Sequence, residues 1–174
     1  MGYVHNVAMS QFVSPTMISA SAGTWTLAVA SNVWSLDRTA ADASFTIYIP
    51  VPILSSPVAL KGSYLKSIEA MYSIATTTPD DFAYVRLYKD TLAASAASGS
   101  GSINTDTLLA TTIDVHHDTT VERKWKDEHR MTVTLDTPAW IDNDETYHLE
   151  LVIDAAAGSV VKIFGANINY TLRF

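Results

Sequence analysis

Apolar and polar side chains alternate with a period of two along several segments of this 174-residue chain. In the segment 130–135, Met131, Val133 and Leu135 share one face, and every intervening residue is polar. The chain also contains 20 Thr, 14 Val and 12 Ile, and β-branched side chains favour pleated strands over helices. Such a period, with one apolar and one polar face, is typical of antiparallel sheets that bury one side.

Turn-forming residues gather between these segments, as at Thr78–Asp81 and Asp142–Asp144. Several short strands separated by turns, with no long helical repeat, predict a β-sandwich. We therefore expect an all-β fold, an antiparallel β-sandwich of the jelly-roll type with eight or nine strands. The segments expected to form strands are 24–30, 32–36, 44–51, 63–75, 83–89, 106–115, 129–135, 146–154 and 160–172.

The composition excludes several classes of protein. The 11 basic and 18 acidic side chains give a net charge of −7. Because the sequence contains no basic cluster that could neutralise phosphates, it argues against nucleic acid as a partner. The absence of cysteine excludes disulfides and thiolate metal sites. The densest apolar run, residues 47–54, contains two prolines and is far shorter than the about 20 residues of a membrane helix. We expect a soluble protein with no membrane span and no cofactor.

Charged side chains are almost absent from the first third of the chain. Residues 1–60 contain only three of them, beginning at Asp37, and the other 26 lie in residues 61–174. A domain surface normally carries about a quarter to a third charged residues, so this segment has little surface suited to water. It forms either an interface between copies of the protein or a neutral, mobile arm. We expect residues 1–36 to be an interface arm and residues 37–174 to be the sandwich.

Large apolar side chains within the uncharged segment argue for order and for self-association. A homo-oligomer with closed symmetry, among which we favour a trimer, would bury them, so the main partner is the protein itself. The residues expected at the oligomer interface are Phe12, Met17, Ile18, Trp25, Leu27 and Trp34.

Two segments interrupt the strand pattern. The run 93–102, which is rich in Ala, Ser and Gly, predicts a flexible loop. The run 116–129 is dense in charge and predicts a solvated loop. Within it, Thr119 and Glu122 have the spacing of a capping box, so a single helical turn is the other interpretation.

Side chains of the kinds that bind metals occur in two places. His116 and His117 are adjacent, but neighbours in an extended segment face opposite sides, and His129 would have to fold back to complete a site. The segment Asp142–Glu145 offers oxygen ligands without the spacing or the glycine of a calcium loop. We expect a polar loop and a hairpin turn rather than metal sites, and the sequence leaves metal binding at both places open.

No enzyme motif is present. The chain has no Gly-x-Ser-x-Gly elbow, no glycine-rich phosphate loop and no His-Glu-x-x-His, so we expect no catalytic activity. Trp125 and Trp140 are candidates for a platform on which a sugar ring stacks, which makes a carbohydrate-binding β-sandwich module the alternative function. The competing interpretation is that each packs at the core or at a sheet edge.

Four segments resemble parts of a known class of domain. The runs Tyr64–Ile74 and Tyr84–Lys89 are similar to the long core strands of jelly-roll modules, and Tyr147–Ile153 with Val161–Leu172 is similar to their closing strands. The class in question is the jelly-roll domains of phage virion proteins, found in tails, head fibres and capsid decorations and often trimeric. The resemblance implies a non-enzymatic structural or attachment protein, with glycans or other virion proteins as further partners. It transfers no functional residues to this chain.

Overall fold

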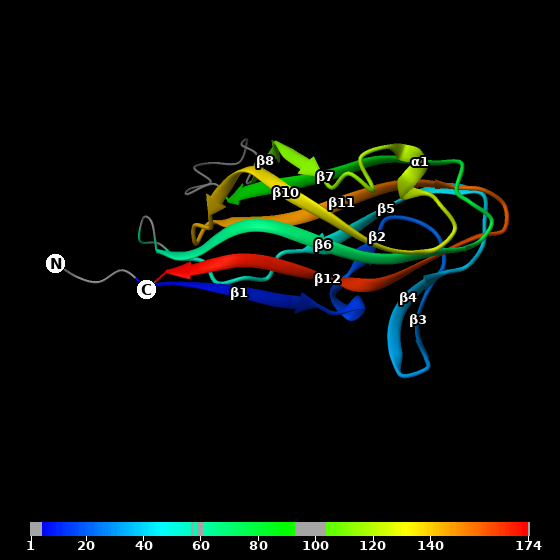
Figure 1. Cartoon of the computed structure of the whole chain (residues 1–174), viewed down its shortest axis with the longest axis horizontal. Helices are drawn as coiled ribbons and strands as arrows, with labels where there is room; N and C mark the ends of the chain where they lie inside the picture. Colours follow the sequence, from blue (N-terminus) through cyan, green and yellow to red (C-terminus); the bar gives the residue numbers. More distant parts are fainter. Residues whose placement is uncertain (1–4, 57, 59–60, 93–103, 174) are drawn as a thin grey trace, which may run out of the picture.

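The computed structural model describes residues 5–56, 58, 61–92 and 104–173, which form two antiparallel β-sheets packed face to face (Figure 1). Sheet A contains β1 (Asn6–Val13), β3 (Trp25–Ala30), β4 (Val33–Arg38), β6 (Gly62–Thr76), β9 (Thr111–Ile113), β10 (Glu128–Trp140) and β12 (Ser159–Arg173). Sheet B contains β2 (Ser19–Ala20), β5 (Ala43–Pro50), β7 (Asp81–Leu92), β8 (Asn104–Leu109) and β11 (Glu145–Ala155). The prediction of an all-β antiparallel sandwich is confirmed.

The strand order is that of a jelly roll. Four antiparallel pairs are nested one inside the next, namely β4 with β12, β5 with β11, β6 with β10 and β7 with β8. This nested ribbon places β4–β12–β6–β10 in sheet A and β5–β11–β7–β8 in sheet B. The strands β1, β2, β3 and β9 are additions to this frame of eight.

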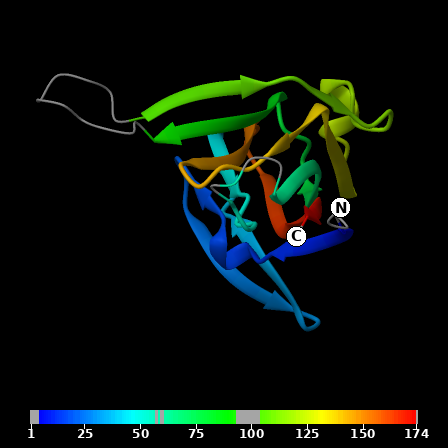
Figure 2. The same cartoon turned by 90° about the vertical axis from the view of Figure 1, so that its left-hand side faces the viewer.

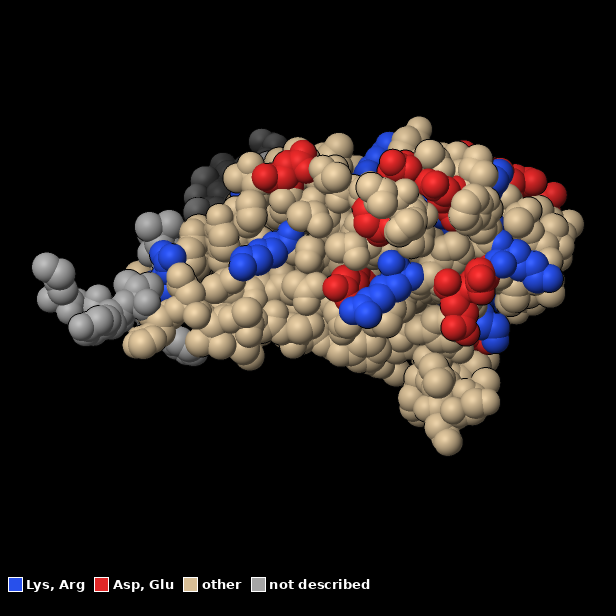
Figure 3. All heavy atoms as spheres, viewed as in Figure 1, with Lys and Arg blue, Asp and Glu red and all other residues tan. Residues whose placement is uncertain are grey.

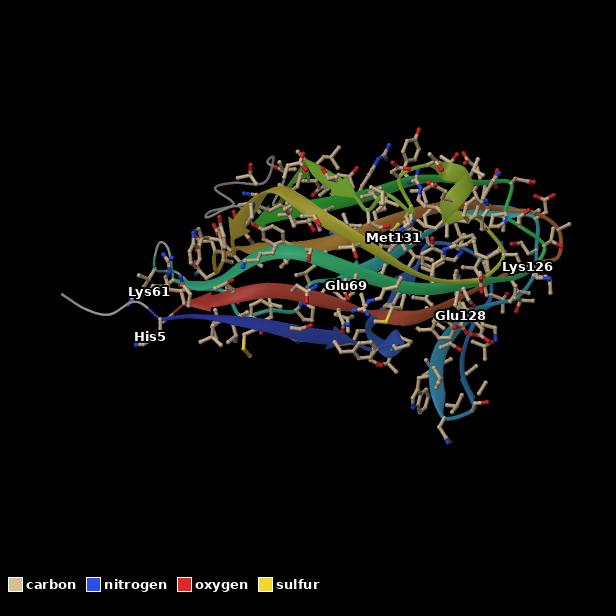
Figure 4. All side chains as sticks on the ribbon, in the orientation of Figure 1. His5, Lys61, Glu69, Lys126, Glu128 and Met131 are labelled. Atoms are coloured by element: carbon tan, nitrogen blue, oxygen red, sulfur yellow. The ribbon has the colours of Figure 1, made fainter. Side chains whose placement is uncertain are left out.

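The alternation seen in the sequence builds the core. In β10, Met131, Val133 and Leu135 are all buried between the sheets, and Figure 4 labels Met131 on this strand. The apolar faces of β5, β6, β11 and β12 are buried in the same layer. Fully burying one such side chain stabilises the fold by roughly 1.5–3 kcal/mol relative to leaving it exposed, so this inner layer dominates stability.

The number of strands differs from the eight or nine expected, because the described residues form twelve. The segment 106–115, expected as one strand, belongs to two strands. β8 ends at Leu109 and β9 begins at Thr111, so Ala110 lies between them. β8 pairs with β7 in sheet B and β9 pairs with β10 in sheet A, so the chain changes sheets at this residue. Periodicity cannot reveal such a change, since both strands keep the same alternation. The other unexpected strands, β1 and β2, lie in the uncharged segment.

The uncharged segment is part of the sandwich. β1 pairs with the second half of β12, from Val13 opposite Ala166 to Asn6 opposite Arg173. β4 pairs with the first half of β12 along the same side. The boundary expected between residues 36 and 37 therefore falls inside β4. Backbone pairing anchors β1 to its own chain, in contrast to the expected arm that wraps a neighbour.

The segment between β9 and β10 is a short helix with buried side chains. The single turn α1 (Thr120–Arg123) begins at the capping box of Thr119 and Glu122, which was the second of the two interpretations of this segment. His117 and Arg123 are buried, so the expectation of a fully solvated loop is wrong for these two residues. The loop expected at 93–102 lies outside the described residues. No helix in the described ranges has the length and apolar character needed to cross a membrane.

Candidate functional site

A hairpin made by β3 and β4 projects from the sandwich at the edge of sheet A (Figure 1). Its two-residue turn, Ser31 and Asn32, has positive φ values of 51° and 65°, as a type I′ turn requires. Only Leu36 and Asp37 of the hairpin pair with β12, so its outer part has no strand beside it in the described chain. The outer part of the hairpin therefore extends beyond the edge of sheet A.

One face of this hairpin is apolar and exposed. Val29 lies opposite Trp34 across the two strands, and Leu27 lies opposite Leu36. The exposed fractions of Leu27, Val29 and Trp34 are 41%, 53% and 53%. Side chains directly opposite one another on one face of a sheet are in contact range, so these residues form one continuous stripe.

The base of the hairpin is fixed to the core. Trp25 packs edge-on against Phe45 with ring centroids 5.2 Å apart, and its Nε1 donates to the carbonyl oxygen of Ala22 at 2.7 Å. Arg38 is buried; its guanidinium lies 4.5 Å from the centre of the Phe45 ring, and Nη1 donates to the carbonyl oxygen of Ala41 at 2.8 Å. Burial lowers the pKa of Arg38. The positive charge nearest the hairpin is therefore turned inward, and the exposed stripe stays neutral.

β1 adds a second apolar region along the same edge of the molecule (Figures 1 and 2). Val7 and Met9 lie on the same side of β1 as the buried Val13, yet they are 44% and 40% exposed. Sheet B does not cover this part of sheet A. On the other side of the strand, Phe12 is 54% exposed and its ring approaches Gly165 of β12.

These residues define what we call the N-terminal apolar surface: Val7, Met9, Phe12, Met17, Leu27, Val29, Val33 and Trp34. They are eight of the fifteen large apolar side chains that are exposed among the described residues, although residues 5–36 make up less than a fifth of the chain. Figure 3 shows that the projecting part of the hairpin carries no charged side chain on the visible face, whereas charges of both signs are spread over the sandwich above it. Exposed apolar side chains gathered in one region mark interaction surfaces more often than scattered ones do.

The residues predicted for the interface divide into two groups. Phe12, Met17, Leu27 and Trp34 are exposed and belong to the N-terminal apolar surface. Ile18 is buried in the core, and Trp25 is half-buried at the base of the hairpin, so both act within the protomer. Four further members of this surface were not predicted from the sequence, namely Val7, Met9, Val29 and Val33. The alternation of residues 25–30 contained the signal for Val29, because it lies two residues after Leu27 on the same face.

The structure does not bring Trp125 and Trp140 together. Trp125 precedes β10 and is 56% exposed, whereas Trp140 ends this thirteen-residue strand. The ring of Trp140 packs on Tyr64 with centroids 4.7 Å apart, and the guanidinium of Arg173 lies over it at 4.7 Å. Both partners border a hollow of about 280 Å³ beside Trp140. A platform that uses both tryptophans is therefore not formed within one chain.

The structure brings together only some of the side chains that the sequence offered as metal ligands. His116 is exposed, whereas His117 is buried and its ring meets that of His129, which does fold back. Asp142 and Glu145 lie at the turn between β10 and β11, where the amide of Glu145 donates to the carbonyl oxygen of Asp142. Within the described ranges, no three or more His, Asp or Glu side chains are arranged to hold a metal ion.

No protein-family model matches the chain, and no curated protein is similar to it in sequence. Among solved structures, it is similar to a family 32 carbohydrate-binding module from C. perfringens NanJ, solved in complex with galactose. The match covers 92% of this chain and 99% of that one, with 14% sequence identity and a TM-score of 0.36. Similarity at this level assigns neither a fold nor a ligand to this chain.

Proposed function

We propose that this chain is a non-enzymatic structural protein that assembles with copies of itself through the N-terminal apolar surface. The observation that carries the proposal is the projecting hairpin, whose face of Leu27, Val29 and Trp34 has no cover in the described chain. Burying these three half-exposed side chains contributes about 1 kcal/mol each, or about 3 kcal/mol per interface. Each 1.4 kcal/mol is a factor of about ten in affinity, so this stripe accounts for about a hundredfold in the dissociation constant.

The edge strands support the same proposal. β1 and β3 both lie at the margin of sheet A and carry no Lys, Arg, Asp or Glu. Proteins that remain monomeric usually protect such edges with charged residues or proline, because an unprotected edge pairs with another chain. Two unprotected edges on one side of the molecule therefore favour association of copies there.

The assembly we propose is a closed ring. In this ring the hairpin docks on a different surface of the next copy, which makes the interface heterologous. Heterologous interfaces close into rings when the rotation between copies allows it, and the trimer is the smallest such ring. A virion or attachment role for this assembly is part of the proposal and rests on the resemblance to phage jelly-roll modules.

Light scattering coupled to size exclusion tests the proposal. We expect a stable multiple of 18.9 kDa for the natural sequence and a monomer, or weaker association by about a hundredfold, for a variant with Leu27→Ser, Val29→Ser and Trp34→Ser. The matched control is Leu108→Ser, Val115→Ser and Val121→Ser, since these side chains are 55%, 75% and 54% exposed outside the N-terminal apolar surface. A monomeric natural protein, or equal effects of the two triple variants, would refute the proposal.

Carbohydrate binding is the second candidate, and one observation favours it. Trp140 and Tyr64 line the hollow of about 280 Å³ together with the polar side chains of Asn6, Lys66 and Thr171. An aromatic surface beside hydrogen-bonding groups suits the apolar face and the hydroxyls of a sugar ring. In a glycan array, Trp140→Ala should abolish retention with the oligomeric state unchanged, and Trp125→Ala serves as the comparison. The second candidate would be rejected if no glycan is retained by the natural protein.

A further inference from the structure

The hollow beside Trp140 is built by four strands of sheet A. Trp140 of β10, Tyr64 of β6 and Thr171 of β12 form one row across the sheet, because Tyr64 pairs with both of the others. Asn6 of β1 and Lys66 of β6 complete the lining together with a second residue of β12, Arg173. The side chains that border the hollow are therefore placed by backbone pairing within one sheet.

Lys66 reaches the hollow through a β-bulge in β6. Leu65 pairs with Tyr170 of β12 and Ser67 pairs with Asn169, so two consecutive residues of β12 face three residues of β6. Lys66 is the extra residue, and its side chain is exposed. A bulge inserts a residue that is left out of the pairing and re-aims its side chain, and bulges are frequent beside functional sites.

The lining of the hollow is positively charged in a protein whose net charge is −7. Of its six residues two are basic, Lys66 and Arg173, and none is acidic. Lys66 forms no ion pair with any side chain in the described part of the chain. Glu69, three residues further along β6, is already paired with Arg130. Figure 3 shows basic side chains and no acidic one over the first part of β6.

The second cation is held at the edge of the aromatic rings. Nε of Arg173 donates to Oδ1 of Asn6 at 2.8 Å, and its guanidinium lies 4.7 Å from the centre of the Trp140 ring. Trp140 in turn packs on Tyr64. The rings and this positive charge are therefore held in place before any ligand arrives, which reduces the entropy that binding costs.

We propose that this hollow binds an acidic sugar, with its ring against Trp140 and Tyr64 and its carboxylate paired with Lys66. The inference rests on the second candidate function, carbohydrate binding, and adds the charge of the ligand. A volume of about 280 Å³ lies just below the usual range of about 300–1,000 Å³ for ligand pockets, so it suits one sugar ring. A carboxylate gives Lys66 a charge-assisted hydrogen bond, which is about twice as strong as a neutral one.

The surroundings of Trp140 also orient the ligand. A smaller hollow of about 110 Å³ borders Trp140 as well, and its lining includes Asp142 and Glu145 beside Lys61. These two carboxylates repel an anion at the turn between β10 and β11. The carboxylate of the sugar should therefore point toward Lys66 and away from that turn.

NMR titration with glucuronate and galacturonate, each compared with its uncharged amide, tests the inference. We expect at least one of these acids to shift the indole signal of Trp140 and to bind about tenfold or more tightly than its amide. Lys66→Gln should abolish this preference. Lys126→Gln is the matched control, because Lys126 is also exposed, forms no ion pair within the described ranges and lies at the opposite end of the molecule (Figure 4).

The inference and the second candidate function fail in different ways. If the amides bind as tightly as the acids, or if a glycan array retains neutral glycans only, the inference is wrong and carbohydrate binding stands. If acetate binds as tightly as the acids, the hollow attracts small anions without recognising a sugar, which also overturns the inference. If neither the acids nor any glycan binds, both are rejected.

Discussion

Replacing Gly165 by alanine tests how β1 is held against the sandwich. Gly165 pairs with Met71 of β6 directly after the register shift at Phe164, and it has a φ of +126°, where a side chain costs about 1–3 kcal/mol. A Cβ atom there would lie 2.5 Å from the carbonyl oxygen of Val13 and 2.6 Å from Cζ of Phe12. The Phe12 ring can rotate away, but the Val13 oxygen belongs to the backbone of β1 and cannot move without displacing the strand.

The size of the expected loss in folding stability follows from a comparison with a second glycine. Gly158 also has a positive φ, of +86°, but a Cβ atom there would meet only the Thr77 hydroxyl, at 3.3 Å. Gly158→Ala should therefore show the backbone cost alone, about 1–3 kcal/mol. Gly165→Ala should cost more, because relieving the backbone contact also weakens the last β1 hydrogen bonds, each worth about 1 kcal/mol.

Urea unfolding of the two variants measures the difference, and amide hydrogen exchange locates it. We expect a lower unfolding midpoint for Gly165→Ala than for Gly158→Ala, and faster exchange of the amides of β1 in the former only. Equal stability of the two variants, or exchange in β1 as slow as in the natural protein, would refute the argument that β1 depends on this close approach.

Two further predictions concern polar contacts. Glu145 accepts a hydrogen bond from Lys89 at 2.7 Å and another from the hydroxyl of Tyr147 at 2.8 Å. Burial raises the pKa of Glu145, but these hydrogen bonds bring it below the ordinary value of 4.5. The ionised carboxylate therefore stabilises the fold above that pH, and this stabilisation is lost as the pH falls through the lowered pKa. The stability advantage over Glu145→Gln in urea unfolding should therefore shrink below about pH 4.5, and a constant difference down to pH 2 would contradict this reasoning. Thr119→Ala removes the capping box of α1 and should cost about 1 kcal/mol, whereas Thr119→Ser should be nearly neutral; equal exchange rates of the α1 amides in both variants would argue against the cap.

The long strands could be predicted from the sequence because each carries its own signal. In β11, for example, Tyr147, Leu149 and Leu151 alternate with exposed or half-buried residues, and one face is buried as predicted. β1 lacked such a signal, since both of its faces are largely exposed and it is held by backbone pairing with β12. Backbone hydrogen bonds do not depend on side-chain type, so periodicity alone cannot reveal them.

The candidate sites, too, could be predicted from the sequence only in part. The absence of charge before Asp37 predicted an unusual surface, and that surface includes four of the six residues named for it. The approach of His117 to His129 could not be predicted, because it depends on how residues 118–128 turn back through α1. The contact between Trp140 and Tyr64 depends in the same way on the register of β10 with β6.

The nested pairing of strands has a consequence for how the chain folds during synthesis. The outermost pair joins β4 (residues 33–38) to β12 (residues 159–173), and β1 also pairs with β12. Neither β1 nor β4 can therefore pair with β12 until β12 has been synthesised. At about 5–20 residues per second, the ribosome needs roughly 6–25 s to proceed from β4 to the start of β12. During that interval the apolar residues of β1 and of the hairpin have no sheet to join. Folding is then limited by the last strand to emerge, and a nascent chain stalled before β12 should depend on chaperones far more than the completed protein does.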